Sequence, residues 1–175
     1  MKTLKKIILA SIILLLTISC KKDDLLKATQ SGSNNMVAKI NGKVWQRKGC
    51  FGCLGGGSGI SVVYNSNGLS IVAEQNDESQ NITINLLLLN ISANAKVQLR
   101  DSNGNPSTNS VAKIQDYQSN KFYVTTENNI GTVTITKFDP NKKIIAGIFE
   151  LKAENENSPN DVINITDGWF DIKYN

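Results

Sequence analysis

The chain has 175 residues, with 19 Lys and Arg against 15 Asp and Glu, and it contains no histidine. It therefore lacks the side chain that most often serves as a general base or metal ligand near neutral pH. Three lysines lie within the first six residues, and the remaining 16 basic and 15 acidic residues nearly balance. This excludes the basic excess with which proteins bind nucleic acid, so we expect no nucleic-acid partner.

The first 19 residues have the pattern of an export signal. The three lysines precede an almost wholly apolar run, Ile7–Ile18, which is shorter than the roughly 20 residues that span a membrane. Ser19 and Cys20 follow and resemble a bacterial lipobox, where the leader is cleaved and the cysteine is acylated, for example with palmitate. Thr17 departs from the larger aliphatic residue of that motif. We predict a lipoprotein signal peptide over residues 1–19 and lipidation at Cys20; an ordinary secretory signal is the alternative.

The residues after Cys20 predict where the protein is held. Lys21–Asp24 resembles the basic-then-acidic export tag of surface lipoproteins of Bacteroidota, and a solvated charged segment is the alternative. Residues 25–35 are small and polar after two leucines, which is typical of a flexible linker. We expect residues 20–35 to tether a single domain, residues 36–175, to the outer membrane by lipid. The domain would face the cell exterior, with the periplasmic face as the alternative.

The rest of the chain predicts a turn-rich β protein. Asn, Gly, Ser and Asp cluster between short apolar runs, and no amphipathic helix of normal length appears. Val37–Gln46 is a predicted hairpin around Asn41-Gly42, a pair that suits a type I′ turn. Val111–Tyr117 is only weakly patterned. The other expected strands are Ile60–Tyr64, Leu69–Ala73, Ile82–Ile91, Lys96–Arg100, Lys121–Thr126, Thr132–Phe138, Lys143–Ala153, Val162–Ile165 and Trp169–Tyr174.

Details within these strands refine the prediction. Ile82–Ile91 changes from alternating to continuous apolar character, which predicts a central strand with burial on both faces. Gly147 interrupts an apolar strand and predicts a bulge or a close backbone contact. Thr166-Asp167-Gly168 predicts a tight turn between the last two strands. Roughly 9–11 strands joined by short turns predict an all-β fold, an antiparallel β-sandwich or flattened barrel.

The most distinctive stretches are MVAKINGKVW, which begins at Met36, and GTVTITKFDPNKKIIAGIFELKAEN, which begins at Gly131 and is followed by VINITDGWFDIKY. They resemble a family of uncharacterised lipoproteins of Bacteroidota. The resemblance covers residues 36–175 and implies an all-β domain of the cell envelope, without implying an activity. The chain departs from the family pattern at Trp169, where a basic residue is expected, and in the inserted Cys50–Cys53.

Cys50-Phe51-Gly52-Cys53 is the one reactive-looking motif. A glycine run follows it, so no helix is available to activate a thiol as in thioredoxin-type chemistry, and zinc usually needs four ligands. We favour a local disulfide between Cys50 and Cys53, with free thiols and metal or redox chemistry as alternatives. The run Gly55–Gly59 lacks the spacing of a phosphate loop. Asp101–Asn105 begins like a calcium loop, but Pro106 stands where that loop needs glycine and Ala112 where it needs glutamate. We expect no metal site and no cofactor.

Trp45 and Trp169 are the predicted ligand-contacting aromatics. Both lie opposite the apolar residues of their strands, so we expect both to be partly exposed; exposed tryptophans often stack on sugars or anchor protein contacts, and packing beneath loops is the alternative. No catalytic residues emerge, because paired carboxylates need a defined separation that sequence does not show. We predict a non-catalytic binding or structural module of the envelope with a glycan or surface protein as partner. An exported hydrolase, for example a glycan-directed one with carboxylates in a barrel mouth, is the alternative.

Overall fold

The computed structural model describes residues 28–49, 57–66, 68–77, 80–101 and 109–174. The predicted signal peptide, Cys20, Lys21–Asp24, Cys50 and Cys53 lie outside the described residues, as does most of the calcium-like loop. No helix within the described ranges is long and apolar enough to cross a membrane.

Every regular element in the described part of the chain is a β-strand, which confirms the predicted all-β fold. The sheet is antiparallel and open, with the order β2-β1-β11-β10-β8-β7-β5-β4-β3; β9 also pairs with β10, and β6 pairs with β9. The strands are β1 (Asn35–Ile40), β2 (Lys43–Gln46), β3 (Ile60–Asn65), β4 (Gly68–Asn76), β5 (Asn81–Leu88), β6 (Lys96–Leu99), β7 (Val111–Asp116), β8 (Lys121–Val124), β9 (Gly131–Asp139), β10 (Ile144–Asn155) and β11 (Ser158–Lys173).

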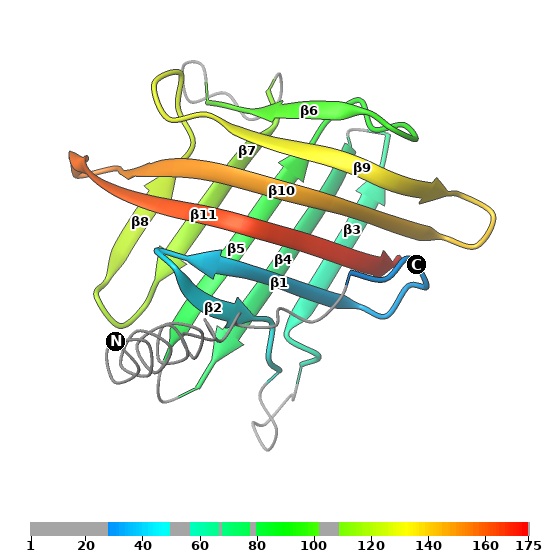
Figure 1. Ribbon diagram of the computed structural model, residues 1–175, viewed down its shortest axis with the longest axis horizontal. Helices are drawn as coiled ribbons and strands as arrows, with labels where there is room; N and C mark the ends of the chain where they lie inside the picture. Colours follow the sequence, from blue (N-terminus) through cyan, green and yellow to red (C-terminus); the bar gives the residue numbers. More distant parts are fainter. Residues whose placement is uncertain (1–27, 50–56, 67, 78–79, 102–108, 175) are drawn as a thin grey trace, which may run out of the picture.

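This sheet folds over itself into two layers at β10 (Figure 1). Most of β10 pairs with β9, whereas its last residues, Glu154 and Asn155, pair with β8. The first layer consists of β2, β1, β11, β10, β9 and β6. Its strands cross the strands of the second layer, β8, β7, β5, β4 and β3, at a steep angle. The outcome is an open sandwich, because the sheet ends at β2 and β3 without closing into a barrel.

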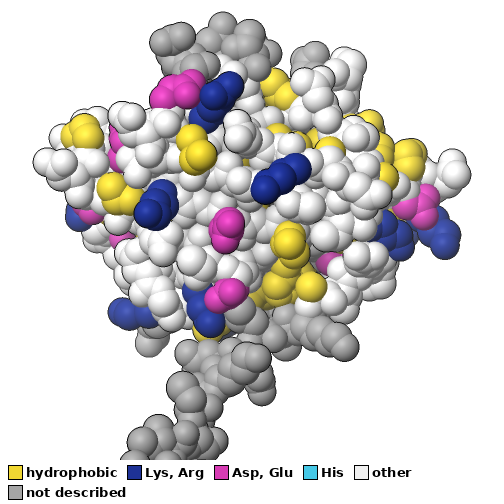
Figure 2. All heavy atoms as spheres, turned by 45° about the horizontal axis from the view of Figure 1, so that its top comes forward, with side chains coloured by type: hydrophobic (Ala, Val, Ile, Leu, Met, Phe, Trp, Pro, Cys, Tyr) yellow, Lys and Arg dark blue, Asp and Glu magenta, His cyan; other side chains and the backbone are white. Residues whose placement is uncertain are grey.

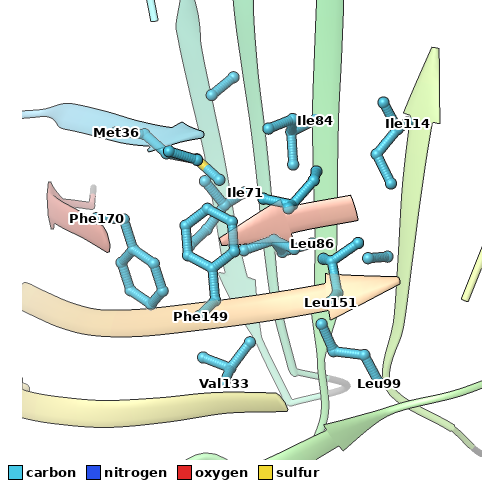
Figure 3. Packing of buried hydrophobic residues seen from close by; sticks show 14 of the residues in the cluster. Met36, Ile71, Ile84, Leu86, Leu99, Ile114, Val133, Phe149, Leu151 and Phe170 are labelled. Carbon is cyan, nitrogen blue, oxygen red and sulfur yellow. The ribbon is translucent and has the colours of Figure 1, made fainter. Parts of the chain in front are cut away.

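Alternating apolar residues build the core between the layers. In Figure 3, Phe149 and Leu151 of the first layer face Ile71 and Leu86 of the second. Strand β5 lies between β4 and β7, as predicted for a central strand. Its predicted two-sided burial is wrong, because burial alternates along the whole strand and Leu87 stays half-buried on the outer face.

Two irregularities shape the longest strands. The prediction of a bulge or a close contact at Gly147 is confirmed: the register shifts between Ala146 and Gly147 because β9 has one extra residue, Thr136, opposite them, and a Cβ on Gly147 would lie 2.6 Å from the Phe170 ring. The predicted tight turn at residues 166–168 is wrong, because β11 runs through it without a break. Asp167, at a φ of 52°, lies in a bulge that gives β11 one extra residue relative to both neighbouring strands.

The Asn41-Gly42 hairpin is confirmed. Both residues have positive φ, 49° and 81°, as a type I′ turn requires. The turn is also tied to β11, since the backbone N–H of Asn164 donates to Asn41 Oδ1 at 2.9 Å. A local turn thus places β2 at the edge of the first layer.

Candidate ligand-binding groove

The outer face of the first layer carries a row of side chains that crosses five strands. Antiparallel pairing aligns Val37, Trp169, Ile148, Thr134 and Lys96 on β1, β11, β10, β9 and β6. Residues paired directly across antiparallel strands point to the same face of a sheet. Their chain neighbours on β9, β10 and β11 belong to the core, so this row points away from it.

The Trp169 groove, as we call it, consists of two adjoining hollows on this outer face. The first has a volume of about 430 Å³ and is lined by Trp169, Ile148, Thr134 and Lys96, among others. The second, of about 440 Å³, extends along the same strands toward Ile130, Lys152 and Asn164. Both hollows are lined by Thr132 and Glu150. The groove therefore follows β9, β10 and β11 across the outer face.

Trp169 is more deeply placed than predicted. Its side chain is only 6% exposed, so the expectation of partial exposure is wrong. It nevertheless lies outside the core cluster and lines the first hollow. Its indole Nε1–H is buried and has no acceptor among the described residues, and an unpaired buried donor of this kind costs roughly 1–3 kcal/mol.

The groove is polar and carries both signs of charge. Lys96, Glu150 and Asp167 line the first hollow together with two threonines, and Lys39 Nζ lies 3.1 Å from Asp167 Oδ2. On the face of the molecule seen in Figure 2, basic and acidic side chains are likewise interspersed. A glycosidase acid is a desolvated carboxyl, whereas Glu150 and Asp167 are both exposed. The groove offers hydroxyl, amide and charged groups to a polar ligand.

Trp45 is part of the core, and its predicted ligand contact is wrong. The side chain is fully buried, opposite Ala38 of β1. Its Nε1–H donates to the backbone oxygen of Ile82 at 3.2 Å. Because Trp45 lies in the first layer and Ile82 in the second, this hydrogen bond joins the two layers. The neighbouring Val44, apolar but 41% exposed, is the residue that points outward.

Asp171 forms a site that sequence reasoning missed. It lies on the outer face of β11, two residues beyond Trp169, and is fully buried. Its carboxylate accepts backbone N–H groups of Ser31 at 3.0 Å, Gly32 at 2.7 Å and Ser33 at 3.1 Å, together with the hydroxyls of Thr29 and Ser33. The one sign of this site in the sequence is a single aspartate between the apolar residues Phe170 and Ile172. No neighbouring residue indicates which groups hydrogen-bond to it.

These contacts correct the domain boundary. Residues 28–34, which we call the strap, belong to the segment predicted as a flexible tether, yet they are bound to the domain. Besides the contacts to Asp171, Lys137 Nζ donates to the Gln30 carbonyl at 2.7 Å, and the N–H of Lys173 donates to Asn34 Oδ1 at 2.8 Å. Ala28 also lines the first hollow. The chain therefore joins the domain beside the Trp169 groove.

The strap stabilises the ionised form of Asp171. Burial by itself would raise the pKa of this carboxyl, but the hydrogen bonds from Thr29, Ser33 and Gly32 outweigh burial and lower the pKa to about 2. Asp171 is therefore ionised at neutral pH although no cationic side chain is among its hydrogen-bond partners. Its carboxylate thus holds the strap against β11 through these hydrogen bonds.

A second polar cluster lies where the sheet turns its corner. Asp161 accepts hydrogen bonds from Lys121 Nζ at 2.8 Å and from Asn155 Nδ2 at 3.1 Å. The bond from Lys121, with smaller help from Asn155 and Tyr123, lowers the pKa of Asp161. This cluster joins β8, β10 and β11, so it helps to hold the sheet together where its two layers meet. Among the described residues, no group of three or more acidic or cysteine side chains could hold a metal ion.

No family model, curated protein or solved structure matches this chain.

Proposed function

We propose that this protein is a lipid-anchored lipoprotein of the outer membrane whose β domain binds a glycan in the Trp169 groove without catalysing a reaction. The observation that carries the proposal is the recessed indole of Trp169, whose N–H lacks an acceptor among the described residues, in a hollow lined by hydroxyl and charged side chains. Ligand sites are typically concave, with a few placed polar groups among apolar ones.

The chemistry of the groove favours a polyhydroxylated ligand. Sugar hydroxyls both donate and accept hydrogen bonds, so they suit Thr132, Thr134, Lys96 and Glu150 together. A sugar oxygen would accept the Trp169 N–H, and the apolar face of a sugar ring would pack on Ile148, which is 49% exposed. Because the two hollows adjoin, a chain of several sugar units fits better than a single one.

Replacing Trp169 with phenylalanine is expected to weaken glycan binding at least tenfold. The substitution keeps an aromatic ring and removes the N–H, so the ligand loses its hydrogen bond to the groove. The measurement is binding of the soluble chain, starting at Ala28, to an array of neutral and acidic glycans. Val162→Ala is the control, since Val162 is an exposed residue of the same strand outside both hollows. Unchanged binding by Trp169→Phe would refute the groove as the site.

The N-terminal sequence supports a lipid anchor. An apolar run that ends at Ser19-Cys20, followed by Lys21–Asp24, is the pattern of an acylated protein exported to the surface of a Bacteroidota cell. Several acyl chains anchor a protein stably, whereas one chain binds only marginally. The short chain segment between Cys20 and Ala28 would keep the Trp169 groove near the membrane.

Cys20→Ala is expected to release the protein from the membrane fraction. The substitution removes the thiol that would carry lipid, and the domain itself has no other proposed anchor. The measurement is fractionation of the expressing cells, with protease treatment of intact cells to report which side the domain faces. A variant that stays in the membrane fraction would contradict the anchor; wild-type protein protected from protease would place it on the periplasmic face.

A further inference from the structure

The outer face of the second layer contains another hollow, of about 500 Å³, that the proposed function does not use. Register aligns Val72, Asn85 and Lys113 across β4, β5 and β7, and aligns Thr83, Gln115 and Phe122 across β5, β7 and β8; all six line the hollow. The residues between these rows, such as Ile84 and Ile114, point into the core. The hollow therefore lies on the opposite side of the sandwich from the Trp169 groove.

Hydrogen-bonding groups of both kinds line this hollow. Asn85 Oδ1 is shielded from solvent and has no donor among the described residues, and a shielded acceptor without a partner is costly. Gln115 and Thr83 add an amide and a hydroxyl, which both donate and accept. One lysine, Lys113, and one glutamate, Glu156, balance each other. This lining suits a neutral ligand that offers hydroxyl donors.

Two aromatic side chains border the same hollow. Phe122 is 40% exposed and Tyr117 is 51% exposed. Aromatic rings that stay exposed to water on a sheet face do not gain the free energy of burial. Their faces pack well against the C–H groups of a sugar ring. The combination of exposed rings with amide and hydroxyl groups is a chemistry that recognises carbohydrate.

We propose that this hollow, the Phe122 site, binds a neutral oligosaccharide independently of the Trp169 groove. The presence of two glycan sites rests on the proposed function, but binding at the Phe122 site is independent of it. Two sites on opposite faces would let one domain hold two chains or two segments of one polymer. Attachment to a polymer would then be stronger than attachment to a short oligosaccharide, because the second binding event is intramolecular.

The test is calorimetric titration of the full-length protein in detergent with neutral hexasaccharides of glucose, mannose and xylose. In the Trp169→Phe background, one binding event should remain for at least one of these sugars. Adding Phe122→Ala or, separately, Gln115→Ala should weaken that event at least tenfold. Val63→Ala is the matched control, because Val63 is 55% exposed on β3 of the same layer and does not line the hollow. Urea unfolding of each variant confirms that it is folded.

The outcomes separate the two proposals. If Trp169→Phe binds as wild type and Phe122→Ala abolishes binding, the Phe122 site stands and the groove fails. If Trp169→Phe abolishes all binding of these hexasaccharides, the Phe122 site is refuted. The Phe122 site is also refuted if the remaining event is unaffected by both Phe122→Ala and Gln115→Ala.

Discussion

Replacing Trp45 with alanine is expected to lower the free energy of unfolding by about 3–5 kcal/mol. The side chain is fully buried between the layers, so its removal leaves a large cavity in the core. The backbone oxygen of Ile82 also loses the donor that Trp45 provides from the other layer. The measurement is equilibrium unfolding in urea at neutral pH.

Two further variants separate the stability lost to the cavity from the stability lost with the hydrogen bond. Trp45→Phe fills most of the space but has no N–H, so it should cost about 0.5–1.5 kcal/mol through the lost hydrogen bond to the Ile82 oxygen. Val44→Ala, at the neighbouring outward-facing position, should change stability by no more than about 0.5 kcal/mol. Equal losses for Trp45→Ala and Val44→Ala would contradict the assignment of Trp45 to the core.

Asp171→Asn is expected to lower the free energy of unfolding by about 2 kcal/mol at pH 7, the free energy that corresponds to a pKa lowered from 3.8 to about 2. A carboxylate with a lowered pKa stabilises the folded state fully above its ordinary pKa and loses that contribution as the pH falls. The stabilities of wild type and variant should therefore differ at pH 7, approach each other below about pH 4, and converge near pH 2. Urea unfolding at these three pH values measures the difference.

The strap offers an independent control for Asp171. A chain that starts at Met36 lacks residues 28–34 and should lose a similar amount of stability. Asp171→Asn should then cost little more in the shortened chain, because residues that share one network are not additive. Asp167→Asn, on an exposed carboxylate of the same strand that pairs with Lys39, should have an effect below about 1 kcal/mol. An undiminished effect of Asp171→Asn in the shortened chain would show that the strap is not its source.

Local patterns account for the features that were predicted correctly. The alternation of Ile82, Ile84 and Leu86 places one face of β5 in the core, since successive side chains of a strand point to opposite faces. Asn41-Gly42 accepts the positive φ angles of its turn, and Gly147 leaves room for the Phe170 ring. The alternation and the turn depend on neighbouring residues alone, so sequence was sufficient for them; at Gly147 sequence indicated an interruption of the strand, but not that the Phe170 ring of β11 would lie there.

Alternation predicted the wrong face for Trp45, and for Trp169 it predicted the right face but the wrong degree of exposure. In β2 the apolar Val44 points outward and Trp45 inward, because the register with β1 places Trp45 opposite Ala38 on the core side. Trp169 does face outward, but it is nearly buried within the row that runs from Val37 to Lys96. A short strand with two large apolar neighbours permits either assignment, and only pairing with the next strand selects one.

The composition and order of residues in this chain were enough to establish an all-β protein with its main strands and turns. Sheet order, the continuity of β11 and both candidate ligand sites were decided by tertiary structure. The clearest case is Asp171, whose partners Thr29, Ser31 and Ser33 lie 138 to 142 residues away along the chain. Such contacts depend on which strands pair and in which register, and that choice reflects the packing of the whole core rather than any single segment.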